Sequence, residues 1–164
     1  MNINELKTFA ESLLDTFRYA GQKSLDLRDK GLKTTIKEDN TPVTNGDIEV
    51  NNLLVEKIES ITPNIPIISE ETVDVRKQND SRDFWLIDPI DGTKDYINNR
   101  DEFTLNAALI INLNPVLGII NAPGKKRLFY SYGKGHAFEI NKDNKFKIEC
   151  KKKTKRGEVL AVSN

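Results

Sequence analysis

Three acidic residues of this sequence, Glu70, Asp88 and Asp91, could bind metal ions with their side chains. One apolar run ends just before Glu70, another ends at Asp88, and Asp91 follows three residues later. Because strand ends meet at the rim of a sheet, we expect the three carboxylates to converge. Magnesium binds such oxygen ligands together with phosphate oxygens. The pattern predicts a site for two magnesium ions, about 4 Å apart, that would activate a water and hold a leaving oxygen.

The segment Asp88–Thr93 also has the features of a phosphate-binding turn. Pro89 fixes its own φ and has no N–H, which favours a turn between the two aspartates. Such a turn would bring both carboxylates and the Ile90 carbonyl towards one ion. Gly92 permits close approach of the backbone. The N–H groups of Gly92 and Thr93 would then be free to hold a phosphate, more so if a helix begins there.

Each of these residues also has an ordinary structural interpretation. An Asp-Pro-Ile-Asp-Gly stretch is common in turns, and Glu70-Glu71 is typical of a solvated acidic pair. Asp47 lies three residues after Thr44, which is the position of a helix-capping box. Thr93 alone could cap a helix. The occurrence of all these residues in one chain, with acids directly after apolar runs, favours the metal site.

The elements that would position these residues are two helices followed by strands. Apolar residues recur every three or four positions, which predicts one helix over residues 4–29 and another from Thr44 to about Pro63. Short strands are expected around 34–36, at 65–68 and at 84–87. A β-meander is then expected over 103–111, 116–121, 127–132, 136–140 and 145–149. The order indicates an α+β fold, with two N-terminal helices packed on a largely antiparallel sheet.

The composition excludes several classes of protein. The 164 residues carry 25 basic and 25 acidic side chains, so the formal net charge is zero. This balance argues against a protein that binds mainly nucleic acid or acidic membranes. No apolar run reaches the roughly 18 residues of a membrane span, and no signal peptide is evident. The single cysteine suggests a reducing compartment. We expect a cytoplasmic protein, associated at most peripherally with the cytoplasmic side of the inner membrane.

Three segments occur in a characteristic order along the chain: Pro42–Asp47, Ser69–Glu71 and Asp88–Thr93. Together they resemble the signatures of the inositol monophosphatase superfamily, which are lithium-sensitive, magnesium-dependent phosphatases. Two further stretches, Gly92–Ile97 and Asp101–Asn106, resemble the bacterial 3′(2′),5′-bisphosphate nucleotidases of the CysQ type. The resemblance covers nearly the whole chain. It implies the N-terminal domain of the sugar-phosphatase-like fold, with Mg²⁺ as cofactor and two or three ions in a complete enzyme.

The resemblance also implies which residues bind the metal ions. Glu70 and Asp88, with the carbonyl of Ile90, would bind the first ion. Asp88 and Asp91 would bind the second ion. Glu70 would also assist catalysis, through a water or a weaker third metal ion.

The same resemblance implies how the reaction is catalysed. Asp47 would accept a hydrogen bond from Thr93, whose oxygen would orient the attacking water. The backbone at Gly92 and Thr93 would hold the phosphate. The implied catalytic residues are thus Asp47, Glu70 and Thr93, and the implied substrate-binding residues are Glu70, Ile90, Asp91, Gly92 and Thr93.

One departure from the family pattern concerns its second domain. That α/β domain carries a Trp-Asp signature whose aspartate completes the second metal site. The single tryptophan of this chain is Trp85, which precedes Asp88. We therefore expect residues 1–154 to form the α+β domain that binds metal and phosphate. Residues 155–164 would be a linker and the first strand of a C-terminal α/β domain that is otherwise missing.

The function implied by the resemblance is that of a magnesium-dependent phosphomonoesterase. It would hydrolyse the 3′-phosphate of adenosine 3′,5′-bisphosphate to AMP and phosphate, with impaired activity in this shortened chain. Two alternatives stay open: an inositol-phosphate phosphatase, or a non-catalytic relative that retains weak metal and phosphate binding. The expected partner is a small phosphorylated nucleotide, and no nucleic acid is expected because the net charge is zero.

Overall fold

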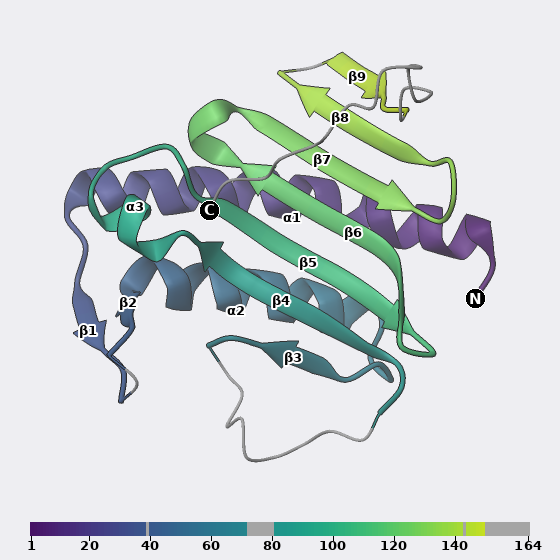
Figure 1. The fold of residues 1–164 in the computed structure, drawn as a ribbon, viewed down its shortest axis with the longest axis horizontal. Coiled ribbons are helices and arrows are strands. Elements are labelled where there is room, and N and C mark those ends of the chain that lie inside the picture. The colour runs from purple at the N-terminus through teal and green to yellow at the C-terminus, as the bar shows by residue number, and fades with distance from the viewer. Residues whose placement is uncertain (39, 72–80, 143, 150–164) are drawn as a thin grey trace, which may run out of the picture.

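The computed structural model describes residues 1–38, 40–71, 81–142 and 144–149 (Figure 1). Two long helices, α1 (Ile3–Lys30) and α2 (Asn45–Ile61), lie behind a seven-stranded sheet in this view. A short helix, α3 (Thr93–Ile97), and a 3₁₀ helix, η1 (Pro123–Lys125), lie between strands. The strands are β1 (Thr34–Ile36), β2 (Pro42–Thr44), β3 (Ile67–Ser69), β4 (Phe84–Asp91), β5 (Thr104–Ile111), β6 (Asn114–Ala122), β7 (Arg127–Tyr132), β8 (Ala137–Asn141) and β9 (Asn144–Lys147). The predicted α+β fold is confirmed.

Helix α1 forms where its apolar periodicity predicts. Asn2 caps its first turn by accepting hydrogen bonds from the N–H groups of Asn4 and Glu5. The helix ends at Lys30 and is followed by the capping residue Gly31, which has a φ of 93°. Its buried side chains recur every three or four residues, as expected for a helix that covers a sheet. They are Leu6, Ala10, Leu13, Phe17, Ala20 and Ser24.

Helix α2 begins with the predicted capping box. The Thr44 hydroxyl accepts hydrogen bonds from the N–H groups of Gly46 and Asp47, and the Asp47 carboxylate accepts one from the Thr44 N–H. The helix ends at Ile61, shortly before Pro63, which cannot continue a helix. The capping box fixes Asp47 at the first turn of α2, in the direction of the sheet.

The sheet has the strand order β3-β4-β5-β6-β7-β8-β9. All neighbouring strands are antiparallel except β3 and β4, which run parallel with Ser69 opposite Ile87. A largely antiparallel sheet is therefore confirmed. Because β3 and β4 run in the same direction, the acidic residues that follow or end them lie at the same end of the sheet.

One predicted turn, at Pro89, and one residue outside the predicted strands, Pro115, belong to strands instead. Strand β4 continues through Pro89 to Asp91, and its pairing with β5 is irregular between Asp88 and Asp91. The irregularity accommodates the missing N–H of Pro89. Pro115 lies within β6, because the hairpin turn is made by Asn112 and Leu113, which have φ values of 50° and 63°.

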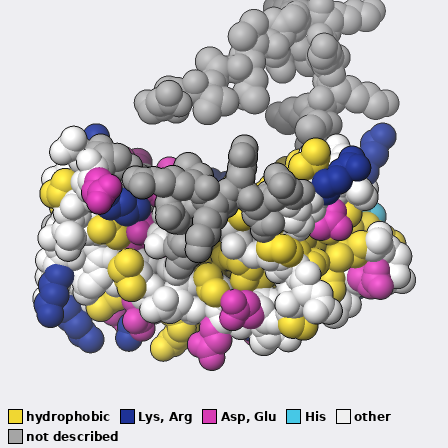
Figure 2. All heavy atoms as spheres, turned by 90° about the horizontal axis from the view of Figure 1, so that it is seen from below, with side chains coloured by type: hydrophobic (Ala, Val, Ile, Leu, Met, Phe, Trp, Pro, Cys, Tyr) yellow, Lys and Arg dark blue, Asp and Glu magenta, His cyan; other side chains and the backbone are white. Residues whose placement is uncertain are grey.

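The core lies between the two helices and the sheet. Trp85 on β4 is fully buried there, and its indole N–H donates a hydrogen bond to the Thr62 hydroxyl over 3.0 Å. On the other face of the sheet, Leu86 and Ile120 are 48% and 46% exposed. Seen from the lower side of Figure 1, the surface carries interspersed basic and acidic side chains (Figure 2), in keeping with the zero net charge.

Among the described residues, no helix combines the length and the hydropathy that a membrane crossing requires. The predicted linker and strand over 155–164 lie outside the described residues. The domain boundary therefore stays a prediction.

Candidate active site

The ends of β3 and β4 bring the predicted acids together. The Glu70 N–H donates to the Ile87 carbonyl over 3.1 Å, which extends the parallel pairing by one residue beyond β3. Burial raises the pKa of Asp88 to about 7, and the negative charges of Glu70 and Asp91 contribute to the same shift. Glu70 and Asp91 are thus both close enough to Asp88 for their charges to act on it.

Asp88 has the features of a cation ligand. Its Oδ1 is buried and has no hydrogen-bond partner within the described residues. A buried carboxylate oxygen without a partner is costly, and a bound cation would compensate it. As placed, no three or more Asp, Glu, His or Cys side chains of the described part are arranged to hold an ion. Asp91 Oδ2 instead accepts a hydrogen bond from Asn106 Nδ2 over 3.4 Å.

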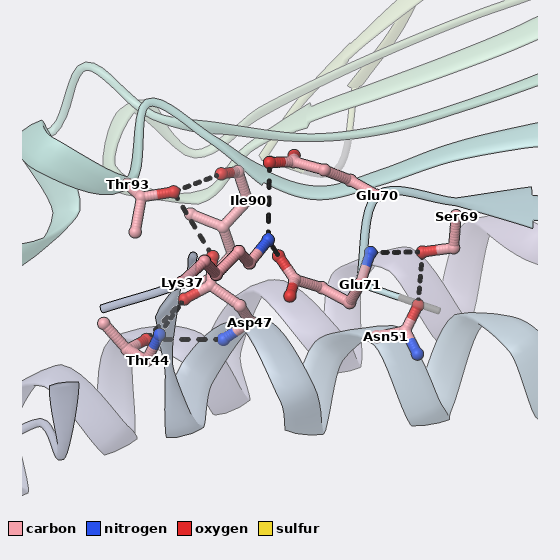
Figure 3. A network of polar contacts seen from close by, with 9 residues as sticks. All are labelled: Lys37, Thr44, Asp47, Asn51, Ser69, Glu70, Glu71, Ile90 and Thr93. Atoms are coloured by element: carbon pink, nitrogen blue, oxygen red, sulfur yellow. Dashed lines mark hydrogen bonds and ion pairs between the residues drawn. The ribbon is translucent and has the colours of Figure 1, made fainter. Parts of the chain in front are cut away.

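Asp47 and Thr93 are brought together as predicted. The Thr93 hydroxyl lies 3.3 Å from Asp47 Oδ1 and 3.1 Å from the Ile90 carbonyl oxygen (Figure 3). Asp47 Oδ2 accepts hydrogen bonds from the Thr44 N–H and hydroxyl over 2.8 and 2.6 Å. Burial raises the pKa of Asp47, while the hydrogen bonds from Thr44 and Thr93 oppose the shift. The Thr93 oxygen therefore has a fixed position beside the acids.

The backbone turns sharply between the acids and α3. Gly92 has a φ of 90°, and a Cβ there would lie 2.8 Å from the Glu102 carbonyl oxygen. Both the conformation and the close approach require glycine. Helix α3 begins at Thr93, and the N–H groups of Asp95 and Tyr96 donate to the Gly92 carbonyl. A helix of five residues thus begins directly after Gly92, which is the arrangement that would strengthen phosphate binding by the backbone at this point.

Lys37 is a member of the site that the sequence did not reveal. Its ammonium lies 2.9 Å from Glu71 Oε1 and 3.7 Å from Glu70 Oε1 (Figure 3). Burial acts against its charge, but the hydrogen bond and charge of Glu71 outweigh this effect and raise the pKa of Lys37. Lys37 follows β1, and the β1–β2 hairpin brings it to the acids. No local spacing signals a partner so distant in sequence.

Glu71 is not solvated, unlike the alternative in which Glu70 and Glu71 form a solvated acidic pair. Its side chain is only 5% exposed, whereas that of Glu70 is 52% exposed. Burial raises the pKa of Glu71, and Lys37 opposes this shift. Only Glu70 therefore has the exposure expected of a solvated residue.

A buried hydrogen bond fixes the end of β3 on α2. The Ser69 hydroxyl donates to Asn51 Oδ1 over 2.6 Å, and the Glu71 N–H donates to the same hydroxyl oxygen over 3.4 Å (Figure 3). Asn51 lies on the buried side of α2. A polar residue in an otherwise apolar helix face was the sequence signal that could have identified it.

The profile of the inositol monophosphatase family matches residues 3–163. The 3′(2′),5′-bisphosphate nucleotidase CysQ of Aggregatibacter actinomycetemcomitans is 36% identical over 123 residues, covering 74% of this chain and 46% of that protein. The crystal structure of CysQ from Bacteroides thetaiotaomicron is 32% identical, with a TM-score of 0.61, covering 80% of this chain and 48% of that one.

A more distant structure shares the fold. An IMPase/NADP phosphatase complexed with Mg²⁺ and phosphate is 18% identical with a TM-score of 0.72, covering 82% of this chain and 51% of that one. The chain spans about half the length of the curated relatives it matches.

Proposed function

This chain belongs to the inositol monophosphatase family, and we propose that it acts as a magnesium-dependent phosphomonoesterase. The proposed reaction is hydrolysis of the 3′-phosphate of adenosine 3′,5′-bisphosphate to AMP and phosphate. The choice of substrate is supported by the relatives named as 3′(2′),5′-bisphosphate nucleotidases. The observation that carries the metal-dependent chemistry is Asp88, whose buried Oδ1 has no hydrogen-bond partner among the described residues and whose pKa is raised in part by the charges of Glu70 and Asp91.

The proposed ligands of magnesium are Glu70, Asp88, Asp91 and the carbonyl of Ile90, with two or three ions in a complete enzyme. Magnesium supplies charge that stabilises the transferred phosphate and lowers the pKa of water. The four groups lie at the end of β4 and the adjacent end of β3. The Asp88 oxygen, which has no hydrogen-bond partner in the described part of the chain, and the other hard oxygen donors fit such an ion.

Thr93 and Asp47 have the proposed role of orienting the attacking water. The Thr93 hydroxyl donates its proton to Asp47 Oδ1 or the Ile90 carbonyl, both within 3.3 Å. A lone pair of the Thr93 oxygen is then free to accept a hydrogen bond from the water. Glu70, half exposed at the same rim, would assist through a second water. The backbone at Gly92 and Thr93 would hold the phosphate.

The chain as given is expected to be a poor enzyme. It spans about half of the relatives, and the proposed second domain would supply a further acid and the nucleoside pocket. We expect turnover at least about a thousandfold slower than in a complete relative, which corresponds to roughly 4 kcal/mol in the activation barrier.

A cytoplasmic location, without a nucleic-acid partner, is part of the same proposal.

The test is a phosphate-release assay with magnesium, using adenosine 3′,5′-bisphosphate, inositol monophosphate and fructose bisphosphate. The Aggregatibacter relative serves as the positive control, and Asp88→Asn as the negative control. Preference for the bisphosphate nucleotide, lost in Asp88→Asn, would support the proposal. Preference for inositol monophosphate would favour the inositol-phosphate phosphatase. Magnesium binding without phosphate release from any substrate would favour a non-catalytic relative.

A further inference from the structure

A basic pocket lies between α1 and the ends of β6, β7 and β8. Its volume is about 190 Å³. Four cationic side chains line it: Arg18 from α1, Lys126 after η1, Arg127 from β7 and Lys142 after β8. No aspartate or glutamate is among the described residues that line it. Such a concentration of one charge in a chain of zero net charge creates a local positive potential.

The floor of the pocket is formed by side chains that are almost fully buried. Leu128 and Ile140 are 3% and 7% exposed, and Asn121 is 5% exposed. The Asn121 side-chain amide donates to the Phe17 carbonyl over 2.7 Å, which fixes its orientation. A Cβ at Gly21 would lie 2.3 Å from the same amide nitrogen. Glycine at that position lets α1 approach the sheet closely and close the pocket on one side.

The pocket is separate from the candidate active site. Cross-strand pairing aligns Asn121, Leu128 and Ile140 in one row, and these side chains are buried on the helix-covered face. The neighbouring row contains Asp88 opposite Asn106. Successive residues of a strand point to opposite faces, so Asp88 points away from the helices. A ligand in the pocket would therefore not contact the acids.

Two of the four cations have partners on the protein. Arg127 Nε donates to Glu139 Oε1 over 2.7 Å. Arg18 lies 3.6 Å from Asp15, which is 97% exposed. Lys126 and Lys142 form no ion pair with a described residue. These two lysines are therefore the cations available to a ligand.

The backbone holds both lysines in an uncommon conformation. Each has a φ of 55°, in the left-handed region that favours glycine or asparagine. The Lys126 N–H donates to the Pro123 carbonyl over 3.0 Å, so η1 fixes this conformation. Because Arg127 pairs with Asn141, the two lysines start from defined positions at the same end of the β7–β8 pair.

We propose that this pocket binds a small phosphate anion with two or more negative charges, without a metal ion. Lys126 and Lys142 supply the free positive charge, Arg18 supports it, and the ends of β6 to β8 supply a preformed floor. The pocket volume suits a small phosphate compound and not a polymer. The proposal does not depend on the proposed phosphatase function, because it involves none of the acids.

The experiment titrates the chain with pyrophosphate by calorimetry, at low ionic strength and with EDTA present. We expect one pyrophosphate per chain, and about tenfold weaker binding in the double variant Lys126→Gln/Lys142→Gln. The matched control is Lys7→Gln/Lys134→Gln, which removes the same charge at exposed positions and should change affinity less than about twofold. Methyl NMR should show shifts at Leu128 and Ile140 on binding.

Circular dichroism melting establishes that both double variants are folded. Equal weakening by the two double variants would overturn the proposal, since charge alone would then explain binding. No binding at low ionic strength would also overturn it. Clearly tighter binding in Asp88→Asn would assign the anion to the active site instead, because that variant removes a repelling negative charge there. Tighter binding of an oligonucleotide than of pyrophosphate would contradict the stated size of the ligand.

Discussion

Asp88 combines a buried carboxylate oxygen with two neighbouring negative charges. Burial and the charges of Glu70 and Asp91 raise its pKa from 3.8 to about 7. Without metal, the folded chain therefore binds a proton on Asp88 over a pH range in which the unfolded chain does not. Stability contributed by that proton is present at low pH and is lost as the pH rises through the folded pKa.

Asp88→Asn should therefore change how stability depends on pH. In EDTA, we expect the free energy of unfolding of the unsubstituted chain to fall between about pH 4 and about pH 7. The free energy of unfolding of Asp88→Asn should fall less over the same range. At about pH 8 it should exceed that of the unsubstituted chain by on the order of 2 kcal/mol, after allowing for partial solvent contact. Urea unfolding at several pH values measures this. Asp29→Asn, at an exposed position, is the control. Parallel pH profiles for Asp88→Asn and the unsubstituted chain would contradict the prediction.

Asp47→Asn should separate a structural role from a catalytic one. The side chain caps α2 and also accepts from Thr93. Because asparagine retains one oxygen, we expect a stability loss of about 1 kcal/mol or less. In a full-length relative, the corresponding change should lower turnover about a hundredfold or more, since the charge is lost. Melting and turnover are measured on the same preparations. Unchanged turnover would refute the catalytic role.

Lys37→Met should destabilise the chain by leaving Glu71 buried without its partner. Because Lys37 is itself 26% exposed, we expect a loss of about 2 kcal/mol, below the 3–5 kcal/mol of fully buried pairs. Glu71→Gln alone should cost less, and the double variant should cost less than the sum. Urea unfolding of the four proteins in EDTA gives the coupling energy. Strict additivity would show that the contact contributes nothing to stability.

At the scale of elements, three helices meet around Tyr96. Its ring is fully buried on α3, and its hydroxyl donates to the Ser24 carbonyl of α1 over 2.6 Å. A Cβ at Gly46, in the first turn of α2, would lie 2.4 Å from the Tyr96 hydroxyl oxygen. The contact fixes the start of α2, and with it Asp47, relative to α3 and Thr93.

Gly46→Ala should therefore be destabilising, although alanine is the better helix former. We expect a loss of about 2 kcal/mol, because Tyr96 cannot move without losing its buried hydrogen bond. Gly118→Ala is the matched control, since the nearest atom to its Cβ would be Ser131 Oγ at 3.7 Å. Thermal melting of both variants tests this. Similar melting temperatures for Gly46→Ala and Gly118→Ala would show that the close approach of Gly46 to Tyr96 is not important for stability.

The sequence predicted those parts of the site that depend on local spacing. Thr44 and Asp47 are three residues apart, and their capping box follows from that spacing. The parallel pairing of β3 and β4 could not be predicted, because a stretch of sequence rich in charged residues separates the two strands and a three-residue strand carries little signal. The position of Lys37 depends on that pairing and on the β1–β2 hairpin. The continuation of β4 through Pro89 depends on an irregular register with β5.

At the scale of the whole molecule, the two faces of the sheet differ. The helices cover one face, while the other carries Leu86 and Ile120, each about half exposed. A groove of about 620 Å³ on this second face is lined by Asp88, Asp91 and apolar side chains of the central strands. The order of helices and strands predicted that helices would cover one face of the sheet. That order could not predict how the second face is used, because that depends on contacts beyond a single strand.

The intrinsic fluorescence of Trp85 should report on the packing of the helices against the sheet. Trp85 is the single tryptophan, it is buried between β4 and the end of α2, and its indole is hydrogen-bonded to Thr62. We expect short-wavelength emission that acrylamide quenches poorly, and a red shift when the helices separate from the sheet. Followed during heating, this shift should coincide with the loss of helical circular dichroism. An emission shift at a lower temperature would show that the helical layer detaches before it unfolds.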